Sequence, residues 1–396
     1  MNILDGRDVI QRGVLRMAGD RFSFGVPDTY PRAGTHATMP EPPGDSPGCG
    51  VGADDAVLVG WSGRRGRSMA GAKYGLTLSN RSVLLGMSTV GEMLDLAVKA
   101  DRAEVWDSVW VGDSIFAKPR LDAMVALGAL AACTERVGLG VGCMASMPLR
   151  DALLFAYQWL SFDALSGGRS IFVACQGQRE AGGGKFAEEF AAFGIDPGTR
   201  SRRMEEAIEI MRLVSETENA SYEGTYNRFE NVTVLPRPVQ QPLPIWVTAN
   251  PNPAFPTLSE RALRRVARMG DGWMTTANTP ETLATNLAAI RRYADEEGRP
   301  LDEGFEASLY YNIHVTEDRN RGMGEVASYL KDYYSVDYDR AFLDRWVAIG
   351  DPGRCVELIR RFVDVGATTI TLRLVGHDEA GQFRRVTEEV LPALVG

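Results

Sequence analysis

Polar side chains that could do chemistry stand at the ends of apolar runs in this chain. The run DSVWVGDS, residues 107–114, suits the inside of a sheet until it stops at Asp113 and Ser114. A carboxylate and a hydroxyl in that place either cap the next turn or face a ligand. We expect a ligand, because similar side chains end other apolar runs: Asn80, Cys143, Cys175, Gln176, Asn250 and Thr276.

Other residues with chemical potential favour simpler interpretations. Cys143 and Cys175 are expected to be small core residues, because no histidine or helix terminus that would lower a thiol pKa is evident beside them. Lys118 and Arg120 are expected on the solvated surface, with anion binding as the alternative. The three histidines lie far apart and lack metal-ligand spacing, so no metal site is predicted. They are His36, His314 and His377.

The composition excludes several classes of protein. With a net charge of -9 and a pI near 5.1, the chain lacks the clustered positive charge that nucleic-acid phosphates require. Its apolar runs are too short to span a bilayer, and its first residues lack a signal-peptide core. The five cysteines show no C-x-x-C spacing, which is typical of scattered free thiols. We therefore expect a cytoplasmic protein that binds neither nucleic acid nor membrane.

Residues 1–72 differ from the rest of the chain. They are rich in Gly and Pro and show neither helical nor strand periodicity, so we expect an irregular or disordered N-terminal extension. GDSPG (44–48) and GCGVGA (48–53) match nucleophile and dinucleotide patterns, but neither follows a strand or opens a helix, and both are interpreted as accidental. The extension is either a genuine tail or the result of a start assigned too early, with Met69 as the alternative start.

From residue 73 to residue 396 the pattern alternates between strand and helix. Eight apolar runs are predicted as strands: KYGLTLSN, DSVWVGDS, VGLGVGCMA, RSIFVACQGQ, PIWVTAN, GWMTT, FEASLYYNIHVTE and TTITLRLVG. A helix is expected after each, and more helix is expected after the seventh strand, from about 323 to 362. This number of βα units predicts a (β/α)8 barrel of the TIM type. A doubly wound open sheet is the second choice, because the first strand lacks the glycine fingerprint of that fold.

Five segments, in register from about residue 73 to 395, resemble the luciferase-like flavin-dependent oxidoreductases. They are DSVWVGDS, PRLDAMVALGALAACTERVGLGVG, LSFDALSGGR, PIWVTAN with RVARMGDGW, and DPGRCVELIRRFVDVGATTITLRLVG. The resemblance implies a (β/α)8 barrel with an insertion between the fourth and fifth units. It also implies a flavin or deazaflavin over the strand ends and a homodimer.

The resemblance further implies roles for particular residues. Gly142 and Cys143 stand where the family often has a non-prolyl cis peptide behind the cofactor ring. The segments after FVACQG and VTANPN match the regions that hold the cofactor phosphate, where backbone N–H groups would serve. The implied cofactor-binding residues are Asn80, Asp113, Gly142, Cys143, Cys175, Gln176, Gly177, Thr248 and Asn250. Asp113 and Ser114 are the candidate catalytic residues.

Two departures from the family pattern bear on the chemistry. Many relatives read Gly-Asp-His where this chain has Ser114 after Asp113, and members similar to true luciferases have a histidine where this chain has Asp113. The usual His-Pro before the third helix is replaced by RDA, residues 150–152. Proton transfer by a histidine at this strand end is therefore not expected.

The implied function is redox chemistry with a flavin-type cofactor. We expect a monooxygenase that uses reduced FMN and O2 on a small organic substrate, with a separate flavin reductase as a candidate partner. FMN is favoured because Lys118, Arg120 and Lys185 are too few to hold the polyglutamyl tail of a hydroxydeazaflavin. Hydride transfer with that deazaflavin is the alternative, which Asp113 and the C-terminal motif favour. A barrel that binds flavin without turnover, or a partner subunit, is the last alternative.

Overall fold

The chain alternates between strand and helix from its first described strand onward. The computed structural model describes residues 71–178, 184–276 and 278–395. The extension predicted over residues 1–72 lies outside the described residues, except for positions 71 and 72, which have no regular structure. The first strand, β1 (Lys73–Thr77), begins where the pattern predicted it.

Eight parallel strands close into a barrel. The ring closes because β9 pairs with β8 along one edge and with β11 along the other. In ring order these strands are β1, β2 (Ser108–Val111), β3 (Gly138–Val141), β4 (Ser170–Ala174), β7 (Ile245–Thr248), β8 (Gly272–Thr276), β9 (Glu306–Val315) and β11 (Thr369–Leu374). The predicted (β/α)8 barrel is confirmed, and the open sheet is excluded.

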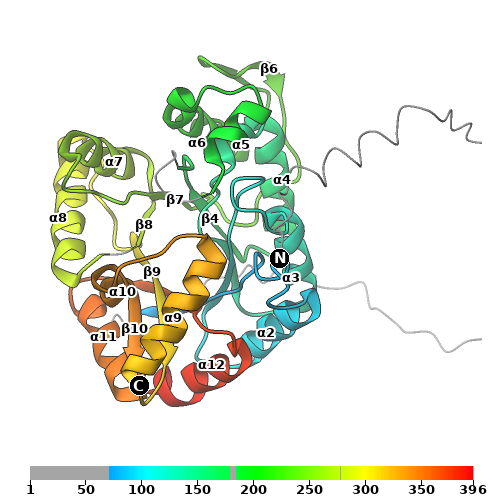
Figure 1. The fold of residues 1–396 in the computed structure, drawn as a ribbon. Coiled ribbons are helices and arrows are strands. Elements are labelled where there is room, and N and C mark those ends of the chain that lie inside the picture. Colours follow the sequence, from blue (N-terminus) through cyan, green and yellow to red (C-terminus); the bar gives the residue numbers. More distant parts are fainter. Residues whose placement is uncertain (1–70, 179–183, 277, 396) are drawn as a thin grey trace, which may run out of the picture. The chain divides into compact units, whose positions relative to one another are not determined.

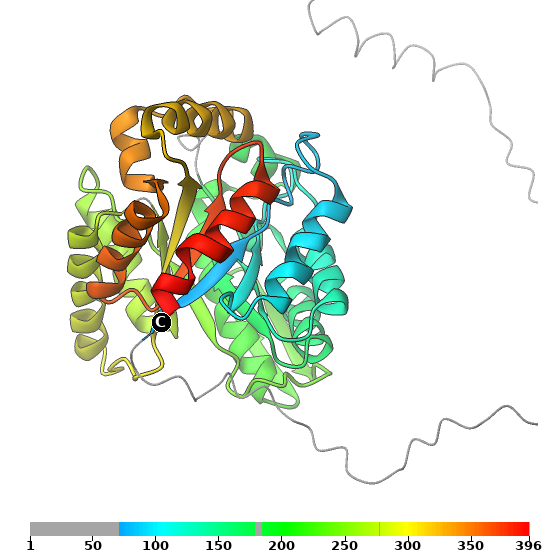
Figure 2. The same ribbon diagram turned by 90° about the horizontal axis from the view of Figure 1, so that it is seen from below.

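Helices surround the barrel on all sides (Figures 1 and 2). In Figure 1, α2 (Val90–Arg102), α3 (Ala123–Cys133) and α4 (Ala152–Leu165) lie on the right, and α7 (Pro256–Met269) and α8 (Pro280–Glu296) lie on the left. The chain ends with α12 (Glu379–Arg385), a π-helical turn (Val386–Val390) and α13 (Pro392–Val395). Side-chain caps fix the helix starts: Thr89 and Glu92 form a capping box at α2, and aspartates accept first-turn N–H groups at α3, α4 and α12.

Alternate side chains of each strand face the helices and the barrel interior. The helix-facing positions join the main hydrophobic core, as Leu309, Tyr311 and Ile313 of β9 do. The interior positions differ between the two sides of the ring. Around β2, β4, β7 and β8 they form an apolar floor: Trp110, Val173, Trp246 and Met274, with Cys143 and Ile171 packed against them. On β1, β9 and β11 they are polar: Thr77, Ser308, Tyr310, Asn312, Thr369, Thr371 and Arg373.

Two glycines make room for Trp110 inside the barrel. A Cβ atom at Gly75 would lie 2.3 Å from the indole of Trp110, and a Cβ atom at Gly140 would lie 2.2 Å from it. Side chains at these positions on the two neighbouring strands would displace the indole, because packed interiors have no spare volume. The glycines of VGLGVG therefore serve the packing of the apolar floor.

The predicted insertion lies between β4 and β7. It contains α5 (Phe186–Ala192), α6 (Arg200–Glu216) and a hairpin of β5 (Ala220–Glu223) and β6 (Arg228–Val232). The buried Glu206 of α6 accepts hydrogen bonds from the N–H groups of Thr225 and Tyr226 in the hairpin turn, at 2.7 and 3.0 Å. This carboxylate fixes the hairpin on α6, at the top of Figure 1.

The helical stretch predicted from about 323 to 362 is interrupted by a strand that was not predicted. The structure has α9 (Arg319–Tyr334), α10 (Arg340–Trp346), the strand β10 (Val347–Gly350) and α11 (Pro352–Asp364) in its place. Helix α9 ends because Ser335 adopts a left-handed backbone with φ 56°. Strand β10 pairs with β9 beyond the stretch that pairs with β8. The four apolar residues of β10 fit a helical pattern as well as a strand, so periodicity could not separate the two.

Candidate functional site

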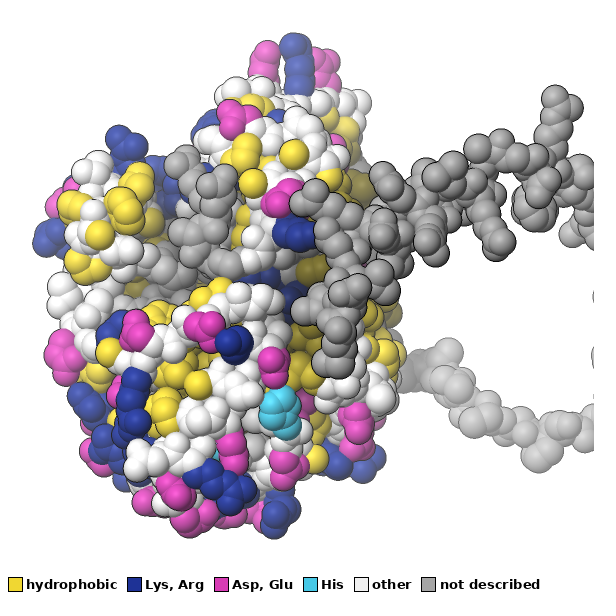
Figure 3. Space-filling model, in the orientation of Figure 1, with side chains coloured by type: hydrophobic (Ala, Val, Ile, Leu, Met, Phe, Trp, Pro, Cys, Tyr) yellow, Lys and Arg dark blue, Asp and Glu magenta, His cyan; other side chains and the backbone are white. Residues whose placement is uncertain are grey.

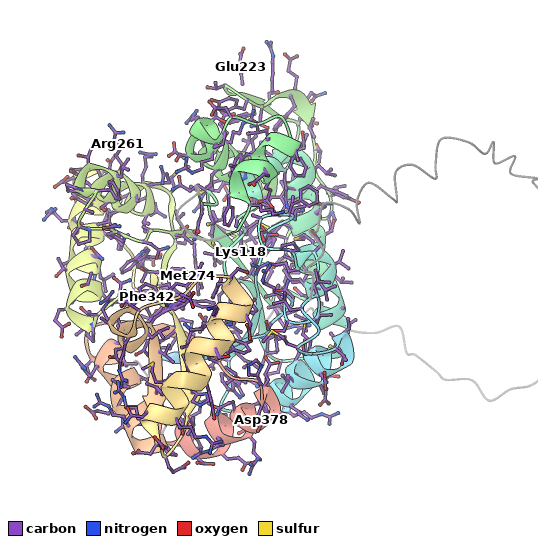
Figure 4. All side chains as sticks on the ribbon, viewed as in Figure 1. Lys118, Glu223, Arg261, Met274, Phe342 and Asp378 are labelled. Atoms are coloured by element: carbon purple, nitrogen blue, oxygen red, sulfur yellow. The ribbon has the colours of Figure 1, made fainter. Side chains whose placement is uncertain are left out.

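The candidate site lies at the carboxyl ends of the barrel strands, where the βα loops converge. Figure 3 shows a hollow in the molecular surface with Lys or Arg atoms inside it. In the same orientation, Figure 4 places Lys118 and Met274 near the centre of the molecule, whereas Glu223, Arg261 and Asp378 lie at its periphery. The contacts of each predicted strand-end residue decide whether it serves the scaffold or is available to a ligand in this hollow.

Asp113 follows β2 and is turned into the protein. Its side chain is 1% exposed; one oxygen lies 3.6 Å from the Arg150 guanidinium, and the other accepts a hydrogen bond from the Ser146 N–H at 2.7 Å. Arg150 also pairs with Asp122 at 3.0 Å. Asp113 thus joins the end of β2 to the segment after β3, and its contact with a cofactor or substrate stays a prediction. Arg150 belongs to the RDA segment that replaces the usual His-Pro.

Ser114 and Glu189 shape the loop that follows. The Ser114 hydroxyl donates to the Lys118 carbonyl at 2.7 Å, so this hydroxyl is used inside the loop. The buried Glu189 of α5 accepts hydrogen bonds from three consecutive N–H groups, of Ile115 (2.8 Å), Phe116 and Ala117 (2.7 Å). A catalytic role for Ser114 stays a prediction, whereas its structural role is direct.

The thiols of Cys143 and Cys175 lie together at the ends of β3 and β4. The bond between Gly142 and Cys143 is a cis peptide, which is the geometry the resemblance implied there. The hydrogen bond between the thiols, together with burial, raises the pKa of Cys143. The same bond, aided by Thr248 and the Gly177 N–H, lowers the pKa of Cys175 against the effect of burial. The neighbouring thiol therefore lowers the pKa of Cys175, a cause that the sequence did not show.

Asn80 and Asn250 hold neighbouring loops together. Asn80 is fully buried; its amide donates to the carbonyls of Gly112 and Leu121, both at 2.9 Å, and accepts from the Gly112 N–H. Asn250 accepts hydrogen bonds from the two threonines at the end of β8. Both amides position strand ends, and their contact with a cofactor stays a prediction.

The two segments expected to hold the cofactor phosphate differ in their local structure. After β4, Gly177 has a left-handed backbone with φ 69°, and Gln176 accepts a hydrogen bond from Ser201 of α6. After β7, the N–H of Asn252 donates to Ser259 at 2.8 Å. Part of the backbone donor capacity of the second segment is therefore used within its own loop.

Four basic side chains meet at the ends of the neighbouring strands β11, β1 and β2. We call them the basic cluster: Arg81, Lys118, Arg120 and Arg373. Lys118 is 7% exposed and Arg373 2% exposed, and Arg120 is half-buried. The expectation that Lys118 and Arg120 lie on the solvated surface is therefore wrong. Glu189 and Ser114 fold their loop inward, which no local pattern in the sequence shows.

Tyrosines surround the basic cluster. Tyr310 comes from β9, and the others come from α9: Tyr329, Tyr333 and Tyr334. The Arg373 guanidinium lies 3.6 Å from the centre of the Tyr333 ring and donates to the Tyr334 hydroxyl at 2.7 Å. Aromatic faces attract cations without neutralising them. The local potential stays positive: burial and the three arginines lower the pKa of Lys118 to about 8.

Four buried polar atoms inside the barrel have no hydrogen-bond partner in the described part of the chain. They are Thr77 Oγ1, Ser308 Oγ, Asn312 Oδ1 and Arg373 Nη2. All of them belong to the polar side formed by β1, β9 and β11. Because buried polar groups are normally satisfied, these atoms fit a bound group that brings its own donors and acceptors. The apolar floor on the opposite side of the ring fits a flat ring system.

His314, near the end of β9, is buried and held by partners within the protein. Its Nδ1 is 2.6 Å from the Val375 carbonyl, and its Nε2 is 3.3 Å from Glu325 of α9. Within the described residues, no group of three or more His, Cys, Asp or Glu side chains could hold a metal ion. No helix in those same stretches is long and apolar enough to cross a membrane.

Sequence reasoning missed Arg81, Arg373 and Glu189. Arg373 interrupts the apolar run TITLRLVG, and a lone cation in a strand buried on both faces is a usable signal, because charges are rarely buried without function or partner. Glu189 gives no such signal, because its partners are backbone N–H groups of a loop distant in sequence.

Comparison with known proteins defines the class to which this fold and site belong. Residues 72–369 match the family of luciferase-like monooxygenases. The chain belongs to this family of TIM-barrel oxidoreductases, as its resemblance indicated.

The sequence relatives include F420-dependent enzymes of similar length. The F420-dependent glucose-6-phosphate dehydrogenase of Intrasporangium calvum is 26% identical over 334 residues, which cover 77% of this chain and 95% of that protein. The enzyme of the same name from Nakamurella multipartita is 27% identical, covering 77% of this chain and 94% of that protein.

Solved structures share the fold. The monooxygenase RslO1 from Streptomyces bottropensis superposes with a TM-score of 0.66 and 24% identity, covering 81% of this chain and 99% of that one. An F420-dependent secondary alcohol dehydrogenase in complex with an F420-acetone adduct has a TM-score of 0.66 and 17% identity, covering 82% and 99%.

Proposed function

We propose that the protein transfers a hydride between coenzyme F420, a hydroxydeazaflavin, and a carbon atom of a small organic substrate. The observation that carries this proposal is the similarity to F420-dependent enzymes over about three quarters of this chain and nearly the whole of those relatives. The sequence favoured FMN because too few basic residues were expected at the mouth to hold the polyglutamyl tail of a deazaflavin. The similarity to F420-dependent relatives now outweighs that argument.

The described residues fit such a cofactor without a metal or a histidine. The deazaflavin, when bound, supplies a carbon that accepts or donates hydride. Trp110, Trp246 and Met274 of the apolar floor would contact the ring and exclude water, which favours a hydride step over side reactions. The unsatisfied polar atoms on β1, β9 and β11 would face the polar edge of the cofactor or the substrate.

Oxygenation with reduced FMN and O2, supplied by a separate reductase, is the second candidate. The apolar floor also favours it, because oxygen chemistry at a reduced flavin requires a site that excludes water. The fold is shared with both kinds of enzyme, so the cofactor itself must be tested.

Titration of the protein with F420 and with FMN, followed by tryptophan fluorescence, distinguishes the two candidates. We expect F420 to bind at micromolar concentration and to quench Trp110 in the floor. Trp110→Phe should lose much of this quenching, whereas Trp106→Phe, which removes an indole stacked on Phe383 outside the barrel, should keep it. Binding of FMN without F420, with substrate-dependent consumption of O2, would promote the oxygenase.

A further inference from the structure

We propose that the basic cluster is a binding site for an anionic group of the substrate, a phosphate or a carboxylate. From the proposed function, this assignment takes only one premise: that a small substrate binds at the barrel mouth. The arginines supply planar forks of N–H donors, which match the oxygens of phosphates and carboxylates. The ligand class follows from the charge, burial and position of the cluster.

The three arginines of the cluster are not balanced by carboxylates of the described residues. In the described stretches of the chain, no acidic side chain lies within salt-bridge distance of Arg81, Arg120 or Arg373. Their acceptors are neutral: Arg81 donates to the carbonyls of Tyr333 and Pro119, and Arg120 to the carbonyl of Lys118. Arg373 donates to a tyrosine hydroxyl and keeps a buried Nη2 without partner. Buried cations such as Arg81 and Arg373 normally have an anionic partner, and a bound anion would supply one that the described residues do not.

Among the described residues, the Glu379 carboxyl group interacts with Arg373, but it offsets this charge only weakly. It lies at the start of α12 and responds to Arg373, but burial raises its pKa to about 7. Near neutral pH a large fraction of this group is therefore protonated and uncharged. The positive potential at the mouth persists.

The cluster has a closed base and an open rim. Arg81 and Arg373 are buried, whereas Arg120, Tyr310 and Tyr334 are half-buried. An anion could therefore enter past the half-buried side chains and reach the buried guanidinium groups. Binding there removes the anion from water, where charge-assisted hydrogen bonds are strongest.

The cluster's place in the ring favours the substrate over the cofactor as the source of the anion. Its residues follow β11, β1 and β2, whereas the segments expected to hold the cofactor phosphate follow β4 and β7 on the opposite side of the ring. One phosphate site on each side would leave the space above the apolar floor for the ring. The anion of the cluster therefore belongs to the substrate.

Calorimetric titration of the full chain with inorganic phosphate, without cofactor, tests the site. We expect saturable binding to the wild type, and binding weaker by roughly tenfold or more in Arg120→Gln and in Arg373→Gln, since each loses a charge-assisted contact. Arg120→Gln tests the rim if the buried variant fails to fold. Arg228→Gln, which changes an arginine exposed by 66% in the β5–β6 hairpin, is the matched control and should bind like the wild type. Absence of binding, or equal binding by all variants, would overturn the site.

A second titration identifies the source of the anion. We expect F420 and phosphate to bind together, each with an affinity unaffected by the other. If phosphate instead excludes F420 but not its riboside, which lacks the phosphate and glutamyl tail, the cluster holds the cofactor tail and the substrate assignment is wrong. If phosphate binds at the cluster but F420 does not bind at all, the anion site stands and the proposed cofactor fails.

Discussion

Asp113 shows, at the scale of single residues, that a strand-end carboxylate can serve the scaffold around a site. Asp113→Ala removes the acceptor of the Ser146 N–H and one of the two carboxylates that pair with Arg150. We expect a loss of about 1–3 kcal/mol in the free energy of unfolding, since a buried donor is left unsatisfied, and a cofactor affinity reduced by roughly tenfold or more. Asp113→Asn keeps an acceptor and should lose less stability, as measured by urea unfolding. Equal stability of both variants and the wild type would contradict this role.

Lys118 predicts a pH dependence of stability. Its pKa in the folded protein is about 8, below the ordinary value of 10.5, because burial and then Arg120, Arg81 and Arg373 disfavour its charge. Between these pH values the unfolded chain binds a proton that the folded chain does not, so this lysine's contribution to stability rises with pH across the window.

Urea unfolding of Lys118→Met across this window measures that contribution. The wild type, relative to Lys118→Met, should gain stability as pH rises from about 8 to 10.5, and little below it. Lys99→Met, a change of an exposed lysine in α2, should show no such trend. A constant difference between wild type and Lys118→Met would mean that Lys118 keeps an ordinary pKa.

At the scale of elements, helix α5 of the insertion positions the loop that carries Lys118 and Arg120. Its Glu189 is 1% exposed and accepts the three N–H groups of residues 115–117. Glu189→Gln keeps one acceptor oxygen but removes the negative charge that three N–H groups share at a single oxygen, Oε2. We expect phosphate binding to weaken several-fold together with a loss of stability, measured by calorimetry and urea unfolding. The exposed neighbour Glu188 gives the matched control Glu188→Gln, and equal effects of the two changes would exclude the positioning role.

The apolar patterns of the elements explain how much of the fold and of the site could be predicted from the sequence. Buried parallel strands read as continuous apolar runs, and the barrel strands were found from them. The strand β10 was missed, because four apolar residues between helices carry no distinctive period. Strand-end residues such as Asp113 and Cys143 follow their strands as expected, and their contact with a ligand stays a prediction. The contacts of Arg150 with Asp113, of Glu189 with the loop after Ser114 and of Arg373 with Tyr334 were not predicted, because they arise from tertiary packing that no local pattern encodes.

At the scale of the whole molecule, the barrel is divided into an apolar and a polar half. The tryptophans of the floor come from β2 and β7, and the basic cluster stands at the ends of β11, β1 and β2. A flat cofactor and a charged substrate make opposite demands on their surroundings. Because one half of the ring is apolar and the other is polar, the barrel mouth can hold the cofactor ring and the substrate anion at the same time. The cofactor and the anion are therefore expected to bind together.

The helices outside the barrel predict a homodimer. Helices α3 and α4 pack side by side (Figure 1), and apolar side chains are exposed on them: Val125 (73%), Leu154 (54%), Tyr157 (49%) and Leu165 (70%). Contiguous exposed apolar side chains mark interaction surfaces, and self-association buries the same face of both copies. We expect light scattering after size exclusion to show a dimer, and Leu154→Asp with Tyr157→Asp to yield a folded monomer. Leu258→Asp on α7, where the leucine is 59% exposed, should stay dimeric. A monomeric wild type, or a dimer unaffected by the paired change, would show that this face is not the interface.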